Sequence, residues 1–87
     1  MTEETLLEFP CAFPIKAMGR NSDDFEQLVT TLIFRHAAPV PGEAVKVNAS
    51  GQGNFLSVTV TVEATSKAQL DRIYQDLTDN EQVLMAL

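Results

Sequence analysis

The stretch FLSVTVTVEA, residues 55–64, decides the fold of this chain of 87 residues. From Leu56 to Ala64 every second residue is apolar, and the residues between them are serine, threonine and glutamate. Successive side chains of a strand point to opposite faces of a sheet, so this alternation predicts a strand with one buried and one solvent-facing side. The residues expected in the core are Val58, Val60 and Val62, and those expected on the solvent side are Phe55, Ser57, Thr59, Thr61 and Glu63.

Weaker patterns predict the other strands of the sheet. Two stretches alternate and a third is a short apolar run; they are residues 13–18, 44–49 and 83–87. In the second stretch we expect Val45 and Val47 to be buried, and in the last we expect Leu84 to face solvent. Residues 50–54 contain two glycines and predict a hairpin connection, because glycine accepts the positive φ angles of tight turns.

Apolar residues spaced three and four apart predict two helices. The first runs from Phe25 to His36, with Ser22 or Asp23 as its N-cap. The second begins at Ser66 and Gln69, which have the spacing of a capping box, and ends at residues 78–80. Core positions expected on the two helices include Leu28, Leu32, Ile73 and Leu77. Ion pairs expected on the solvent side of the second helix are Lys67–Asp71 and Arg72–Asp76.

The order of these elements is strand–helix–strand–strand–helix–strand. Few right-handed, unknotted arrangements accommodate this order, and the usual one is the ferredoxin-like sandwich. We therefore predict an α+β fold, βαββαβ, in which a four-stranded antiparallel sheet carries both helices on one face. The other face of the sheet is expected to be bare, and the second and fourth strands are expected to be its edges.

Composition limits the domain organisation and the partners. Residues 1–12 are acidic, then apolar, and are broken by Pro10; we expect a flexible or docking N-terminal segment ahead of a single domain over residues 13–87. The formal net charge of −6 opposes approach to phosphate backbones and anionic membranes, so neither nucleic acid nor a membrane is expected as a partner. With one cysteine, no disulfide and no targeting signal, a cytoplasmic location is expected.

Short motifs are spread over the chain, at residues 7–10, Phe13, Lys16, residues 18–19, residues 35–37, Ser50 with residues 53–55 and 57–58, residues 64–65, Met85 and Leu87. Together they resemble the motifs of the YbeD-like family of small bacterial proteins. The resemblance implies a ferredoxin-like domain similar to ACT regulatory domains, which bind small molecules such as amino acids at domain interfaces. The resemblance implies a fold and does not point to any catalysed reaction. Residues after Asn21 and over 37–42 depart from the family pattern, which leaves contacts there open.

Two sets of candidate site residues follow. The turn after the first strand precedes a helix N-terminus, where free N–H groups can meet an anion, and ACT domains contact their effectors at this loop. The alternative is a plain tight turn. The candidate ligand-binding residues are Lys16, Gly19, Arg20 and Asn21. The bare face and the fourth strand supply candidate interface residues, namely Met18, Phe55, Ser57 and Leu84, for a homodimer or a partner protein.

The side chains able to carry chemistry are few. His36 has no adjacent partner of metal-ligand or acid–base spacing, and we interpret it as a capping histidine at a helix C-terminus. Cys11 has no basic neighbour in sequence that would activate its thiol as a nucleophile. We therefore predict no enzyme, no metal site and no cofactor.

The predicted function is a non-enzymatic regulatory or protein-interaction module that binds a small metabolite at an interface. The alternative is a weak RNA-binding domain, because the RNA-recognition motif has this topology and an aromatic residue at the position of Phe55. The position of a second ring is occupied by Ser57, and the net charge opposes RNA.

Overall fold

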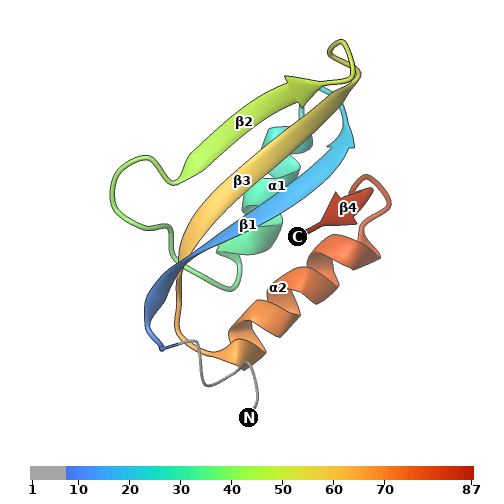
Figure 1. Cartoon of the computed structure of the whole chain (residues 1–87). Helices are drawn as coiled ribbons and strands as arrows, with labels where there is room; N and C mark the ends of the chain where they lie inside the picture. The colour runs from blue at the N-terminus through green and yellow to red at the C-terminus, as the bar shows by residue number, and fades with distance from the viewer. Residues whose placement is uncertain (1–7) are drawn as a thin grey trace.

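A computed structural model of the chain describes residues 8–87. In chain order the elements are β1 (Cys11–Arg20), α1 (Phe25–Phe34), β2 (Val45–Ser50), β3 (Phe55–Ala64), α2 (Lys67–Asp79) and β4 (Met85–Ala86). The strands form one antiparallel sheet in the order β2-β3-β1-β4, and both helices lie on the same face of it (Figure 1). The predicted ferredoxin-like fold is confirmed. Within the described residues no helix is long and apolar enough to cross a membrane.

The N-terminal part of the domain differs from the prediction in one detail. The first strand begins at Cys11, two residues earlier than expected. Phe9 packs against the core, whereas Leu6 and Leu7, also expected to dock, lie outside the described residues.

The core is built on a continuous ladder between β1 and β3. The two strands pair over ten residues, from Cys11 opposite Ala64 to Arg20 opposite Phe55. Because the side-chain period of a strand is two, this register directs one set of side chains from both strands toward the helices. The fully buried residues of this set and of the helices include Ile15, Ala17, Val58, Val60, Val62, Phe25, Val29, Ile33, Ile73 and Leu77. The predicted burial of Val58, Val60 and Val62 on the helix-facing side of β3 is confirmed.

The prediction that Val47 is buried is wrong. Its side chain is 39% exposed, although it is opposite the buried Val58 in the β2–β3 ladder. The helices contact β1, β3 and β4, and neither makes an extensive contact with the edge strand β2. Val47 therefore points to the correct side of the sheet at a place that no helix covers. Leu28, on α1, is likewise only partly buried.

The helix N-termini differ in how they are capped. Ser66 accepts a hydrogen bond from the backbone N–H of Gln69, and the Gln69 side chain accepts one from the N–H of Thr65, so the predicted start of α2 is confirmed. The N-cap of α1 is Asp24, with no side-chain cap, in place of the predicted Ser22 or Asp23. The Ser22 hydroxyl instead lies 3.1 Å from Oδ1 of Asp24, to which it donates.

Gly19 leaves room for a close approach of the α2–β4 connection and of the Phe25 ring to β1. A Cβ at this position would lie against the carbonyl oxygen of Gln82 and 2.5 Å from the buried ring of Phe25. The residue is on the central strand β1, so neither neighbour can move without shifting the α2–β4 connection or the start of α1.

Replacing Gly19 with alanine is expected to lower the free energy of unfolding by about 3 kcal/mol, the upper range for overpacking a core. Urea unfolding followed by circular dichroism measures it. The matched control is Gly53→Ala, where φ is +87° and the surroundings are open, and where the cost is backbone strain of about 1 kcal/mol. Equal losses in both variants would contradict the close approach at Gly19.

Tyr74, the one tyrosine of the chain, lies partly buried on α2, and burial raises its pKa above the ordinary value. Because the folded state holds the phenolic proton more tightly, stability is full below the unfolded pKa of about 10 and falls as the pH rises through the folded value. A spectrophotometric titration of phenolate absorbance should show a higher midpoint for the folded protein than for the protein in urea. Coincident midpoints would contradict this.

Candidate functional site

The side chains that point away from the helices form a surface that we call the open face. The paired registers arrange its central part in three rows that cross the strands. The first row contains Arg20, Phe55 and Ser50. The second contains Met85, Met18, Ser57 and Asn48. The third contains Leu87, Lys16, Thr59 and Lys46, with Leu87 placed by its two backbone hydrogen bonds to Lys16.

Two apolar residues that were not predicted, Met85 and Leu87, lie at the β4 end of the open face. β4 covers only Met85 and Ala86, and Met85 is opposite Met18. Met85 and Leu87 are 51% and 63% exposed and share the face with Met18, whereas Leu84 precedes the strand. Leu84 itself is 59% exposed, as expected; its backbone N–H donates to the carbonyl of Met18, and its side chain lines a pocket beside Arg20.

Ser57 lies in the middle of the open face, yet its side chain is not exposed. Only 6% of its surface is accessible, and its Oγ makes no hydrogen bond with any described residue. The prediction of an exposed Ser57 is wrong. A serine side chain is short, and the longer chains around it in the register, Met18, Phe55 and Asn48, surround it on the pleated surface.

An unpartnered buried hydroxyl is costly, so replacing Ser57 with alanine is expected to raise the free energy of unfolding by about 1 kcal/mol. Urea unfolding of the variant and the wild type measures this difference. Ser50→Ala, at an exposed position of the same face, should leave stability unchanged. Destabilisation by the Ser57 substitution would mean that the hydroxyl has a partner in the free protein.

Half of the basic residues of the chain lie on the open face. Lys16, Arg20 and Lys46 are exposed there, out of six lysines and arginines in all. The acidic residue on the same side of the described strands is Glu63, which is opposite Ala12 at the far end of the β1–β3 ladder. The open face is therefore locally basic, although the chain as a whole carries a net charge of −6.

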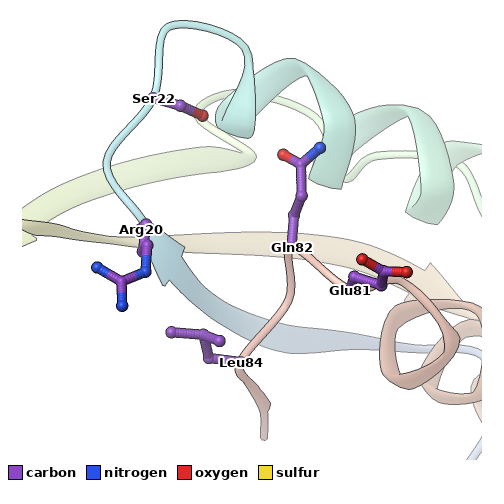
Figure 2. Close-up of a pocket in the computed structure, with 5 residues that line it drawn as sticks. All are labelled: Arg20, Ser22, Glu81, Gln82 and Leu84. Carbon is purple, nitrogen blue, oxygen red and sulfur yellow. The ribbon is translucent and has the colours of Figure 1, made fainter.

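A pocket of about 260 Å³ adjoins the open face at the end of β1. It lies between β1 and the α2–β4 connection and is lined by Arg20, Ser22, Glu81, Gln82 and Leu84 (Figure 2). The Arg20 guanidinium also lies 6.0 Å from the centre of the Phe55 ring, within the range of a cation–π contact. Arg20 thus belongs to both the pocket and the open face. The pocket contains one cation, Arg20, and one carboxylate, Glu81.

The four predicted ligand-binding residues have different positions. Lys16 lies on the open face and Arg20 lines the pocket, whereas Gly19 is buried against the helices. Asn21 donates its backbone N–H to the carbonyl of Asn54 and its side-chain amide to the carbonyl of Gly53. The polar groups of Asn21 therefore connect the β1–α1 turn to the β2–β3 hairpin.

The structure brings a carboxylate to His36 that the sequence did not reveal. Nε2 of His36 lies 2.6 Å from Oδ2 of Asp76, forty residues away, and the His36 carbonyl accepts a hydrogen bond from Gln69. The interpretation as a helix-capping histidine and the predicted Arg72–Asp76 pair are both wrong, because Asp76 faces α1. The predicted Lys67–Asp71 pair is present, at 3.2 Å.

A histidine–carboxylate pair alone does not make an active site, because acid–base or nucleophilic catalysis also needs a reacting group within reach. Cys11, on the first residue of β1, is a free and partly buried thiol. Within residues 8–87 there is no group of three histidine, cysteine or carboxylate side chains that could hold a metal ion. The His36–Asp76 contact fastens the end of α1 to α2.

Comparison with known proteins places the chain in a family. Residues 4–87 match the family described as "Protein of unknown function (DUF493)". The chain is 44% identical to the UPF0250 protein NE1487 of Nitrosomonas europaea, over all of both chains, and 42% identical to a UPF0250 protein of Chromobacterium violaceum, over 98% of this chain and 96% of the relative. No enzymatic activity appears in the descriptions of these proteins.

Two solved structures have the same fold. The solution structure of HP0495 from H. pylori aligns with a TM-score of 0.70 and 18% identity, covering 100% of this chain and 94% of the other. The ACT domain of the GTP pyrophosphokinase of Chlorobium tepidum aligns with a TM-score of 0.67 and 13% identity, covering 87% and 81%. The predicted YbeD-like and ACT-like resemblance is confirmed: the chain belongs to the DUF493, or UPF0250, family of small bacterial proteins.

Proposed function

We propose that the chain is a non-enzymatic regulatory module of the cytoplasm that binds a partner protein through its open face. The observation that carries this proposal is the group of exposed apolar side chains, Met85 and Leu87, on the same face as the half-buried Met18 and Phe55. Exposed apolar side chains gathered on one surface and bordered by polar groups are typical of contact surfaces. The ACT-like fold supports a regulatory role.

The pocket at the end of β1 is where a small metabolite could take part in this contact. It borders the open face at Arg20, and its remaining polar side chains are Ser22, Glu81 and Gln82. A metabolite with both a negative and a positive group would find a counter-charge for each, and a docked partner would close the open side of the pocket. Binding of the metabolite would then change the affinity of the module for its partner.

RNA binding, the alternative function, has less support from the geometry. Base stacking needs a free aromatic face, and the guanidinium of Arg20 lies over the ring of Phe55. The other described aromatic residues belong to the core or to the helices and not to the open face. A nucleotide would have to displace Arg20 from the ring.

The proposal is tested by removing apolar surface without changing charge. In a pull-down from bacterial extract, the variant Met85→Ser, Leu87→Ser is expected to lose the proteins recovered by the wild type. The matched control is Phe34→Ser, Val47→Ser, which removes two exposed apolar side chains elsewhere. The proposal is overturned if the open-face variant recovers the same proteins as the wild type, or if the control loses them equally.

A further inference from the structure

We infer that the segment of the partner that docks on the open face is acidic and amphipathic. This inference rests on the proposed function and adds the chemistry of the partner to it. The partner segment would place carboxylates near Lys16, Lys46 and Arg20, and apolar side chains on the Met18–Met85 part of the face.

The first support is the spacing of the cations. Lys16 and Lys46 flank Thr59 in one row of the sheet, so their strands are about 10 Å apart. Arg20 lies two rows from Lys16 along β1. Glu63 is four residues beyond Thr59, or about 13 Å along β3, which exceeds the screening length of about 8 Å at physiological salt. Lys16 and Lys46 therefore form one positively charged pair, and Arg20, about 13 Å from Lys16 along β1, adds a second positive position on the same face.

The second support is that these cations have no ionic partner in the described part of the chain. Its ion pairs are His36–Asp76 and Lys67–Asp71, both on the helix side. Glu81 shares the pocket with Arg20 but makes no ion pair with it. A carboxylate brought by a partner would not have to break an existing pair, and burial of the contact would strengthen the attraction.

The third support is the hydroxyl of Ser57, which lies between the row of the two lysines and the row of Arg20. It is more than nine-tenths buried and has no partner within residues 8–87. Its neighbour across the ladder is the flexible side chain of Met18. Rotation of Met18 toward an apolar side chain of the partner would let the hydroxyl donate to a carboxylate, which a purely apolar segment does not offer.

A second copy of the chain fits this surface poorly. In a two-fold dimer the same patch meets itself, so contact between two open faces would bring two sets of three cations into one interface. The apolar side chains would become buried, but six unpaired positive charges would lose their hydration. The predicted homodimer is therefore disfavoured at the open face, and the charge pattern favours a different protein.

The test uses a displayed library of short random peptides selected for binding to the full chain, with the recovered peptides then synthesised and measured by fluorescence anisotropy. Recovered peptides are expected to be net acidic and to contain apolar residues. The variant Lys16→Glu, Arg20→Glu, Lys46→Glu should bind them at least about tenfold more weakly, and added salt should weaken wild-type binding. Thermal unfolding checks that each variant is folded.

The matched control reverses the other three basic residues, Arg35→Glu, Lys67→Glu and Arg72→Glu. Both triple variants change the net charge by the same amount, so a difference between them reports position and not total charge. Equal weakening in both variants overturns the inference, because long-range repulsion would then be sufficient. Folded controls that keep wild-type affinity support it.

Two further outcomes separate this inference from the proposed function. Neutral or basic peptides that bind the wild type and are lost by Met85→Ser, Leu87→Ser would overturn the acidic chemistry and leave the contact surface standing. Tighter binding of a labelled single-stranded RNA, lost on reversal of the same three cations, would assign the surface to nucleic acid and overturn the inference. Recovery of no peptide that depends on the open face would count against both proposals.

Discussion

The structure depends on one constraint, the register of the ten-residue ladder between β1 and β3. A shift of β1 by one residue against β3 would exchange the two faces of β1, placing Lys16 beneath the helices and Ile15 in water. The same register that buries the valines therefore also gathers the basic and apolar side chains of the open face. The core and the candidate site therefore depend on the same strand pairing, and a substitution that changes this register alters both.

The sequence predicted the elements and the core of β3 because these depend on local patterns. Strict alternation identifies a half-buried strand whatever lies around it, and a serine followed by glutamine three residues on identifies a helix start. Burial of a particular side chain depends on what covers it. Val47 alternates correctly but lies beyond the reach of the helices, and Ser57 alternates to the open side but is surrounded by longer neighbours. No local pattern contains this information.

The candidate site was predicted in part for the same reason. Lys16, Met18 and Phe55 were placed on the open face by alternation, and the structure puts them there. Met85 was missed because a two-residue strand has no alternation to read, and its register follows from hydrogen bonds made by Leu87. The contact of His36 with Asp76 joins residues forty positions apart. The packing of α1 on α2 brings these two residues together. The i,i+4 spacing within α2 alone had predicted that Asp76 pairs with Arg72.

Net charge was the least informative property of the sequence for this site, since a total does not say where charges lie. The strands place three of six basic residues on one face, while Glu63 is the only acidic residue among 8–87 that lies on a strand. At distances beyond about 8 Å the field is screened, and close contacts depend on the local charge. A long polyanion such as RNA would extend from the open face toward the acidic surface, whereas a short acidic segment ends on the basic rows. This separation of charge would favour a short anionic partner, such as the proposed acidic segment, over a long one.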